Sequence, residues 1–297
     1  MEDGSWLAGR FEEHRARLRA VAYRMLGSVA DADEAVQEAW LRVSAAGADD
    51  VENIGGWLTT IVARICLNGL EARRVRREAA ADDRLPDPIV TLDEARTPED
   101  DLVLADAVGL ALQIVIARLP PPERLAFVLH DLFEVSFEEI ATVMGRSEAA
   151  ARQLASRGRR RVRGAAVPTP DRDLARQRRV VDAFVAAARA GDFDALVAVL
   201  DPDVVRRSDG GDDPTRPSVL HGASAVARSA LAATARRSSV VHRALVNGAA
   251  GIVATIDGRP YAVMGFTVVD DRIVAIDAVL GAERLARLDL PPFGDAP

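Results

Sequence analysis

One cysteine and no lysine occur among the 297 residues. The single cysteine, Cys66, excludes an internal disulfide and is typical of proteins that work in a reducing cytoplasm. Because Cys66 lies in an apolar helical run, we expect a small core residue rather than a nucleophile. Every fixed positive charge is therefore an arginine, and 38 basic against 45 acidic residues leave a net charge of −7.

Long apolar runs are also missing. No segment approaches the roughly 20 apolar residues that are needed to span a bilayer. The N-terminal stretch MEDGSWLAGRFEEH lacks the apolar region of a signal peptide. These absences predict a cytoplasmic protein without membrane contact. The negative net charge argues only weakly against a nucleic-acid partner, because the distribution of charge matters more than its sum.

Positive charge is concentrated in residues 147–163, SEAAARQLASRGRRRVR. Six arginines lie between Arg152 and Arg163, and no acid follows Glu148 in this stretch. An acidic chain with one such basic segment points to a local binding surface for an anionic partner.

Apolar residues at helical spacing predict three helices over residues 6–77. The first covers about residues 6–26. The second begins at Asp31 as the N-cap, with Glu34 as its capping-box partner. The third covers about residues 54–77.

A linker rich in proline and acids, residues 78–101, follows. Its segment RLPDPIV at residues 84–90 has a Pro-x-Pro spacing, which forces an extended path. Residues 102–165 return to helical periodicity. Ser136 and Glu139 form a capping box there, Gly145 ends that helix and Ser147 caps the next, which is the pattern of a helix-turn-helix.

After a second linker at residues 166–173 the pattern changes. Residues 174–233 contain about three helical stretches, whereas residues 238–280 alternate with period two. Asn247-Gly248, Asp257-Gly258 and Asp270-Asp271 mark hairpin turns. Helices followed by an antiparallel meander predict an α+β domain.

The helix that starts at Glu148 has two faces when it is wound at about 100° per residue. An apolar stripe packs on the preceding helix. The N-terminal part of the other face mixes groups that can read base edges, and its C-terminal part is rich in arginines that suit phosphates. A merely solvated face is the alternative, but such faces usually mix charge signs. The expected DNA-contacting residues are Glu148, Ala149, Arg152, Gln153, Ser156, Arg157, Arg159, Arg160 and Arg163.

The helix predicted from Asp31 has an apolar residue, Leu41, in the middle of its polar face. A single exposed leucine is common and needs no function. An apolar centre with an acidic rim, however, also fits a protein-binding surface. This face consists of Asp33, Glu34, Gln37, Glu38 and Leu41.

The third helix ends in ARRVRRE. Favourable charge at a helix C-terminus explains part of this cluster. Four arginines exceed that need, so we expect a second phosphate-binding surface. The preceding loop, GADDVENIGG, could present polar groups to an unstacked base.

These segments resemble the extracytoplasmic-function (ECF) sigma factors, the small promoter-specificity subunits of bacterial RNA polymerase. RMLGSVADADEAVQEAWLR and WLTTIVARICLNGLEARRVRRE resemble their region 2. LPPPERLAFVLHDLFEVSFEEIATVMGRSEAAARQLASRGRRRVR resembles their region 4, and the remainder resembles a SnoaL-like domain, a cone-shaped α+β fold. The resemblance implies a multidomain chain with two all-α domains before the α+β domain. The implied parts are residues 1–77 (the region 2 helical bundle), 78–101 (linker), 102–165 (the region 4 helix-turn-helix), 166–173 (linker) and 174–297 (the SnoaL-like domain).

The resemblance also implies partners, namely promoter DNA and the clamp and flap regions of core RNA polymerase. The face around Leu41 would grip the clamp helices of the largest subunit. The helix from Glu148 would read the upstream (−35) promoter element as duplex. The linker would thread toward the active-site channel, where an acidic extended strand can mimic nucleic acid. The residues implied for the downstream (−10) element are Asn53, Trp57, Thr60, Arg64, Arg73, Arg74 and Arg77.

One ECF subgroup carries such a tail together with three motifs. The Trp-Leu-Pro-Glu-Pro-type linker motif stands here as Arg84-Leu85-Pro86-Asp87-Pro88, and the Asp-Gly-rich motif as Asp209-Gly210-Gly211. The Asn-Pro-Asp-Lys-Leu-type motif is degraded to Gly281-Ala282-Glu283-Arg284-Leu285. The resemblance implies that the tail regulates the sigma regions in cis through intramolecular contact. The implied regulatory residues are Leu85, Pro86, Asp87, Pro88, Asp209, Gly210 and Gly211.

Some tail residues could form an acid–base pair or line a ligand pocket. The candidates are Asp209, His221, His242, Asp257 and Asp277. No spacing among them compels catalysis, and Asp257 lies in a turn where Asp is expected without chemistry. We therefore expect no catalytic residue, cofactor or metal. Two alternatives stay open: a helix-turn-helix regulator that acts without polymerase, and a ligand-sensing or enzymatic tail.

Overall fold

The computed structural model describes residues 2–46, 51, 53–75, 85–92, 109–165, 171–209, 219–235 and 239–293. The chain divides into two compact units. Unit 1 comprises Met1–Asp82 and Gln113–Val167, and unit 2 comprises Asp83–Leu112 and Pro168–Pro297. The chain therefore contributes to unit 2 twice, first with residues 83–112 and again from residue 168 onward.

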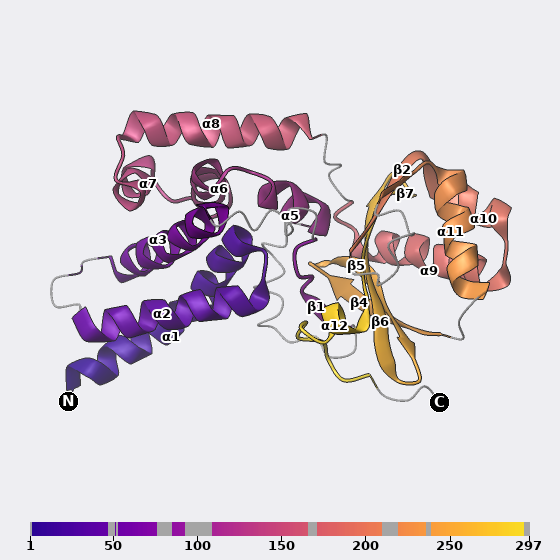
Figure 1. The fold of residues 1–297 in the computed structure, drawn as a ribbon, viewed down its shortest axis with the longest axis horizontal. Helices are drawn as coiled ribbons and strands as arrows, with labels where there is room; N and C mark the ends of the chain where they lie inside the picture. Colours follow the sequence, from indigo (N-terminus) through magenta and orange to yellow (C-terminus); the bar gives the residue numbers. More distant parts are fainter. Residues whose placement is uncertain are drawn as a thin grey trace. The chain divides into compact units, whose positions relative to one another are not determined.

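Three long helices form the first part of unit 1 (Figure 1). They are α1 (Glu2–Leu26), α2 (Val29–Ala46) and α3 (Ile54–Val75). α1 packs against both α2 and α3. The three predicted helices are confirmed, and their buried core includes Leu18, Val21, Met25, Val36, Val43, Leu58 and Val62.

The start of α2 differs from the sequence prediction. Ser28 Oγ accepts a hydrogen bond from the Asp31 amide at 3.3 Å, and α2 already begins at Val29. The predicted N-cap at Asp31 is therefore wrong, because the serine three residues earlier takes that position. Asp31 lies in the first helical turn, where a negative charge is favourable, and its carboxylate pairs with Arg73 at 2.9 Å.

A second group of helices completes unit 1. It consists of α5 (Leu110–Ala117, in unit 1 from Gln113 onward), α6 (Pro121–Phe127), the π-helical turn η3 (Val128–Leu132), α7 (Phe137–Met144) and α8 (Glu148–Gly164). α6 begins at prolines, as predicted. The π-helical turn continues α6 and was not predicted from the sequence.

α7 and α8 form the predicted helix-turn-helix. The Ser136 hydroxyl accepts from the Glu139 amide at 3.2 Å, and the Glu139 carboxylate accepts from the Ser136 amide at 3.1 Å. Gly145 ends α7 with a φ of +61°. Ser147 caps α8 by accepting from the Ala150 amide at 3.3 Å. Each of these local predictions is confirmed.

The two helical groups pack against each other within unit 1. α3 contacts α6 and α7, and α1 contacts η3. The last carbonyl groups of a helix lack the amide partners of the earlier ones. At the end of α1 the Gly27 amide donates to the Tyr23 carbonyl at 2.8 Å, and the second group supplies further donors. Gln113 Nε2 donates to the carbonyls of Tyr23 and Arg24 at 3.3 Å, and Arg124 Nη1 donates to the carbonyl of Met25 at 2.7 Å. Both donor side chains are buried, so this is a specific contact.

The described residues of unit 2 form a sheet of seven strands in the order β1-β4-β5-β6-β7-β2-β3. The strands are β1 (Val90–Leu92), β2 (Leu200–Asp209), β3 (Val219–His221), β4 (Val240–Val246), β5 (Ala249–Ile256), β6 (Arg259–Val269) and β7 (Arg272–Leu280). β4 to β7 form the predicted antiparallel meander. Its turns contain Asn247, Asp257 and Asp270, which have φ values of +50°, +49° and +49°, so the three turn predictions are confirmed.

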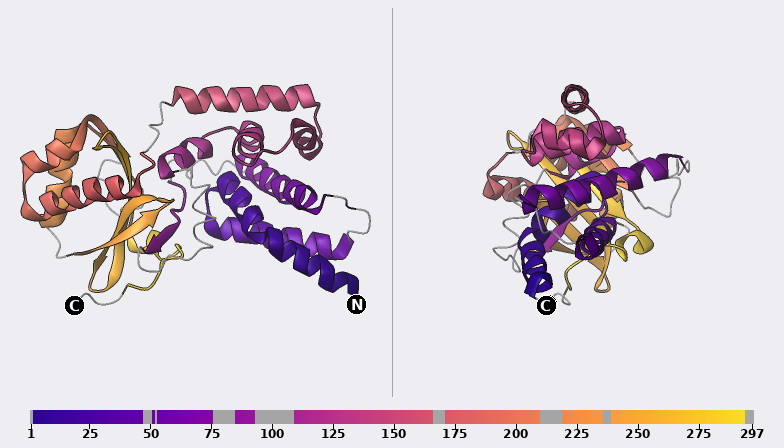
Figure 2. Two further views of the ribbon diagram at one scale, coloured as in Figure 1. Left: turned by 180° about the vertical axis from the view of Figure 1, so that it is seen from behind. Right: turned by 90° about the vertical axis from the view of Figure 1, so that its left-hand side faces the viewer.

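Helices cover one face of this sheet (Figure 2). They are α9 (Leu174–Ala190), α10 (Phe193–Val199) and α11 (Ala223–Ala235). Their apolar sides share a core with Ile252, Phe266 and Ile276 of the sheet. A short fourth helix, α12 (Ala282–Leu285), packs against β6 and β7. The sequence prediction of helices followed by a meander is confirmed as an α+β domain.

Three strands, β1, β2 and β3, were not predicted. β3 pairs antiparallel with β2. β2 lies between α10 and α11 in the chain and pairs in parallel with β7. β1 lies within the predicted linker and pairs antiparallel with β4, with Val90 opposite Val246. Segment 85–92 was predicted as a linker between domains. In the structure it belongs to unit 2 and supplies an edge strand of its sheet.

Candidate functional site

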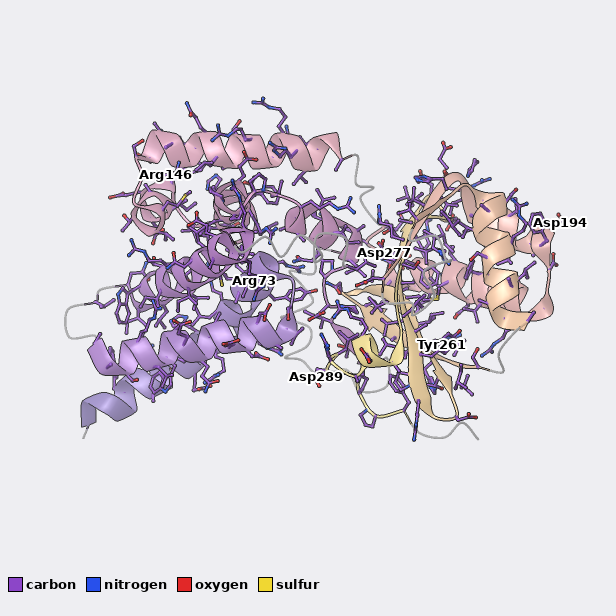
Figure 3. All side chains as sticks on the ribbon, viewed as in Figure 1. Arg73, Arg146, Asp194, Tyr261, Asp277 and Asp289 are labelled. Atoms are coloured by element: carbon purple, nitrogen blue, oxygen red, sulfur yellow. The ribbon has the colours of Figure 1, made fainter. Side chains whose placement is uncertain are left out.

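α8 presents the predicted charged face to solvent. Its apolar stripe is buried as expected at Ala151, Leu154, Ala155 and Gly158. The predicted contact residues are exposed, apart from the half-buried Arg159. Many side chains project from the outer side of this helix in Figure 3. α8 therefore has the form that a groove-reading helix requires.

Three arginines in the C-terminal half of α8 are held by carboxylates of the preceding helices. Glu123 on α6, with a 9% exposed side chain, lies 2.8 Å from Arg161 Nε and 3.4 Å from Arg157 Nε. Asp131 accepts two hydrogen bonds from Arg159 at 2.6 and 3.2 Å, and this contact raises the pKa of the guanidinium. These pairs fix α8 in place and neutralise part of the arginine row, so Arg157 and Arg159 are less available to phosphates than the sequence suggested.

The remaining charged residues of α8 are less constrained by other helices. Arg152 pairs with Glu148 one turn earlier and lies 5.6 Å from the ring centroid of Phe137. An exposed pair of this kind costs little to break, so Arg152 is available to a base edge. Arg160 and Arg163 are exposed and form no ion pair within the described part of the chain.

Gly158 sets the close approach of α8 to α6. A Cβ at this position would lie 3.0 Å from the Glu123 carbonyl oxygen and 3.0 Å from the Phe127 Cβ. We expect Gly158→Ala to lower the free energy of unfolding by about 1–3 kcal/mol through overpacking, as measured by urea denaturation. Gly9→Ala in α1, where a Cβ meets nothing within 4 Å, is the control and should be neutral or stabilising. Equal stability of the two variants would contradict the close helix contact.

The outer face of α2 carries the predicted acidic residues around Leu41. The Leu41 side chain is 61% exposed. Asp33 accepts hydrogen bonds from Arg19 of α1 at 2.6 and 3.1 Å, and Glu38 pairs with Arg42. The rim of this face is thus partly neutralised, and its apolar centre is open to solvent in the part of the chain that the structure describes.

A cleft of about 350 Å³ lies between α2 and α3 beside this face. Acidic side chains of α2 form one wall, and the lining residues include Glu34, Glu38, Arg42, Ile65, Cys66 and Arg73. Burial raises the pKa of Cys66 to about 12, so the thiol stays protonated. Cys66 is a buried core residue, as the sequence predicted.

The N-terminus of α3 carries a polar stripe. Asn53 Oδ1 accepts from the Gly56 amide at 3.0 Å and so caps the helix. Asn53, Trp57, Thr60 and Arg64 follow at spacings of three and four residues, which places them along one side. All four are at least partly exposed, so the structure brings these predicted nucleic-acid-binding residues together.

The arginines at the other end of α3 have different environments. Arg73 is tied to Asp31 at 2.9 Å, whereas Arg74 is exposed (Figure 3 labels Arg73). Arg77 and loop positions 47–50 and 52 lie outside the described residues. Of the residues predicted to bind phosphates at this helix end, Arg74 is exposed, whereas the charge of Arg73 is partly neutralised by Asp31.

Three segments of unit 2 meet in a largely buried cluster of hydrogen bonds and ion pairs, which we call the linker clasp: Leu85, Asp87, Asp209 and Arg284. Asp209 Oδ2 accepts from the Leu85 amide at 3.0 Å, and Arg284 Nη2 donates to the Leu85 carbonyl at 2.8 Å. Arg284 also pairs with Asp87 and lies 3.4 Å from Asp209 Oδ2. The clasp brings together the three motifs read in the sequence. Gly210 and Gly211 lie outside the described residues.

A second contact holds the linker next to β1. The Asn247 amide donates to the Ile89 carbonyl at 2.8 Å, and the Ile89 amide donates to Asn247 Oδ1 at 3.0 Å. Pro86 and Pro88 between these contacts are buried. From Leu85 to Leu92 the linker is therefore held by side chains, by the backbone and by burial.

Two sequence profiles match the helical groups of unit 1. The profile described as "Sigma-70 region 2" matches residues 10–78, and the profile described as "Sigma-70, region 4" matches residues 110–162. The chain is also 42% identical over 272 residues to "ECF RNA polymerase sigma factor SigJ" of Mycobacterium tuberculosis, an alignment that covers 90% of this chain and 86% of that relative. The chain belongs to the ECF RNA polymerase sigma factors.

Further relatives of this sigma factor agree. "Probable ECF RNA polymerase sigma factor SigI" of M. tuberculosis is 31% identical over 274 residues, covering 92% of this chain and 93% of that relative. The crystal structure of M. tuberculosis SigJ is similar with a TM-score of 0.77 and 36% identity, covering 96% of this chain and all of that one. The likeness to SigJ thus includes the α+β domain.

Membership of this family gives the two helical groups their names. α1 to α3 form sigma region 2, and α5 to α8 form sigma region 4. As a sigma factor, the protein acts in transcription initiation with RNA polymerase and promoter DNA. No helix among the described residues is long and apolar enough to cross a membrane.

The candidate acid–base residues of the sigma factor's tail have separate environments. Asp277 is 1% exposed and pairs with Arg207 of the neighbouring strand at 2.6 Å (Figure 3). His242 Nε2 lies 3.0 Å from Thr255 Oγ1, and Asp209 belongs to the linker clasp. His221 ends β3 and Asp257 lies in a hairpin turn. Among the described residues, no three His, Cys, Asp or Glu side chains group so that they could hold a metal ion.

Proposed function

We propose that this sigma factor uses three surfaces to start transcription and that its tail, a SnoaL-like domain, regulates them in cis. The outer face of α2 binds the clamp helices of the largest polymerase subunit. The N-terminal stripe of α3 reads the −10 element, and the exposed face of α8 reads the −35 element. The observation that carries the regulatory part is the linker clasp, because it ties the segment between regions 2 and 4 to the tail.

The polymerase contact rests on the exposed centre of the α2 face. Leu41 exposes 61% of its surface amid polar residues, and desolvating such a side chain in a partner's pocket supplies the free energy of an interface hot spot. The adjoining cleft offers acidic side chains to basic groups of the partner. The alternative hypothesis, a helix-turn-helix regulator that acts without polymerase, does not explain why this surface is exposed.

Regulation in cis is proposed because the linker cannot occupy two places at the same time. The segment from Leu85 to Leu92 lies in the clasp and in the sheet. It cannot be paired with β4 and extend through a polymerase channel at the same time. We therefore propose that the clasped state opposes initiation and that release of the linker permits it.

Transcription in vitro with purified core polymerase tests the proposed function. The template is a library of promoter sequences, and the full chain is compared with a chain that lacks residues 174–297. We expect selective initiation from a subset of templates that share an upstream element, and a changed yield when the tail is removed. Absence of initiation by both chains would contradict the sigma function. Identical yield and identical polymerase affinity would contradict the regulation in cis.

Arg152 tests the assignment of α8. If its guanidinium makes a bidentate contact with a base edge, Arg152→Ala should weaken binding to the selected −35 duplex by about 1–3 kcal/mol and relax the preference at one base pair. Arg163→Ala is the matched control, because loss of a phosphate contact should weaken binding about equally on every sequence. Competition binding against single-base substitutions of the duplex measures both effects. An equal loss on all sequences for Arg152→Ala would make it a phosphate contact.

A further inference from the structure

An irregular stretch of backbone leads into the helix-turn-helix of region 4. The turn η3 is π-helical, and Glu134 shortly after it has a φ of +57°, a value that residues other than glycine rarely adopt. The Val135 amide donates to the Leu129 carbonyl at 2.9 Å, which closes this connection tightly. A π-helical turn contains one residue more than an α-helical turn, and one residue corresponds to a rotation of about 100°. The irregularity therefore sets the direction of the last side chains of η3.

His130 is the side chain that this turn places against α7. The centroid of its ring lies 3.9 Å from the ring centroid of Phe137, with 31° between the two planes. His130 Nδ1 lies 3.1 Å from the Val135 carbonyl oxygen. A carbonyl only accepts hydrogen bonds, so Nδ1 carries the hydrogen. The imidazole is thus fixed by a hydrogen bond at its edge and by the contact with Phe137.

Phe137 links this imidazole to α8. It is the first residue of α7, and the paired hydrogen bonds of Ser136 and Glu139 fix the backbone on both sides of it. α7 lies beside the N-terminal end of α8 (Figure 1). Arg152, in the second turn of α8, has its guanidinium carbon over the Phe137 ring, 5.6 Å from the centroid. A series of contacts therefore runs from η3 through Phe137 to the residue assigned to a base edge.

The Arg152 guanidinium is restrained from two directions and still has donors for a base. Its side chain is 60% exposed and donates to Glu148. A base edge can replace this exposed carboxylate at little cost. The cation–π contact with Phe137 does not require the N–H donors, so it can persist while the guanidinium donates to the base. A side chain whose orientation is already restricted loses less freedom on binding, which strengthens the contact with the matching base.

We propose that Phe137 is a positioning residue for recognition of the −35 element. Its ring holds the Arg152 guanidinium in the orientation that donates to a base edge, and His130 fixes the ring. This inference rests on the proposed function, since it takes Arg152 to contact a base. It gives the irregular turn between α6 and α7 a role in choosing the promoter sequence.

Phe137→Leu tests this role in the full chain. Leucine keeps most of the apolar bulk and removes the ring, whereas Phe137→Tyr keeps the ring and is the matched control. Competition binding uses the −35 duplex selected from the promoter library and its single-base substitutions. We expect Phe137→Leu to lose about two- to fivefold in affinity for the selected duplex, as for loss of an exposed cation–π contact. The preference should fall by the same factor at the base pair that Arg152→Ala relaxes, and Phe137→Tyr should keep both.

Two further sets of variants separate positioning from a general effect on the fold. If Phe137 acts through Arg152, the double variant Phe137→Leu with Arg152→Ala should bind like Arg152→Ala alone. His130→Ala leaves α7 unchanged and should reproduce part of the lost preference. His130→Phe, which retains an aromatic ring, should restore it. Urea denaturation of each variant checks that the chain remains folded.

The outcomes distinguish this inference from the proposed function. An equal loss on every duplex for Phe137→Leu, or losses that add in the double variant, would overturn the positioning role. A relaxed preference for Arg152→Ala with an unchanged preference for Phe137→Leu and His130→Ala would overturn this inference alone. If Arg152→Ala alters the preference at no base pair, the proposed base contact of α8 fails, and the inference fails with it.

Discussion

The Leu41→Glu variant should lose about 30-fold or more in affinity for core RNA polymerase. This loss corresponds to about 2 kcal/mol, the lower limit for a residue at the centre of an interface. A carboxylate at this position would have to be desolvated against the partner, and it adds charge to a face whose acidic residues are already only partly paired. Fluorescence anisotropy of the labelled sigma factor titrated with core polymerase measures the change.

The stability of the folded chain should not change in this variant. Leu41 is 61% exposed, so its replacement removes little buried apolar surface. Val240→Glu is the matched control, because it places the same charge on another exposed aliphatic residue, 39% exposed, in unit 2. We expect the control to bind polymerase like the unmodified chain. If Leu41→Glu retained full affinity, the polymerase face would lie elsewhere and a regulator that acts without polymerase would become the better account.

The Arg284→Ala variant should raise transcript yield severalfold by opening the linker clasp. Arg284 makes contacts with Leu85, Asp87 and Asp209 while its side chain is only 15% exposed. Loss of charge-assisted contacts of this kind costs about 2 kcal/mol, which shifts the ratio of clasped to released linker about 30-fold. The yield cannot rise by more than this factor. Transcription in vitro at limiting sigma factor measures it.

Arg287→Ala provides the matched control for this change. Arg287 lies three residues after Arg284 and is exposed, and no hydrogen bond or ion pair of its side chain is seen within the described residues. We expect its transcript yield to equal that of the unmodified chain. A lower yield for Arg284→Ala would mean that the clasped state promotes initiation. The same yield for both variants would mean that the clasp holds the linker without regulating it.

Features encoded by neighbouring residues could be predicted from the sequence. The capping box of Ser136 and Glu139 and the stop at Gly145 depend on groups within one or two turns, and both formed as predicted. The face of α8 followed from helical winding alone. The N-cap of α2 is also a local feature, but it was misplaced. Two capping residues, Ser28 and Asp31, compete within one turn, and the pattern of side chains does not decide between them.

Features that depend on distant residues could not be predicted. β1 has only three residues, too few for a period to appear, and it pairs with a strand more than a hundred residues later. For this reason the sequence predicted only an extended linker at this position. The Arg157 and Arg161 pairs with Glu123 were hidden in the same way, because the partners lie on different helices.

The degraded motif near the C-terminus shows that comparing residue identities can miss a retained interaction. Gly281-Ala282-Glu283-Arg284-Leu285 keeps little of the family sequence, but Arg284 supplies a cation in place of the lysine. That charge is what Asp87 and Asp209 require. The chemistry of the clasp is therefore present where the sequence of the motif is not.

Amide hydrogen exchange of the linker peptide that contains residues 85–92 tests the central claim most directly. The Leu85 and Ile89 amides donate to Asp209 and Asn247 in the free chain, and hydrogen-bonded amides exchange only when the structure opens. We predict protection of this peptide in the free protein, loss of that protection in Arg284→Ala, and a changed pattern on binding core polymerase. Rapid exchange of the peptide in the free protein, or the same protection before and after polymerase binding, would contradict a linker that the tail holds and initiation releases.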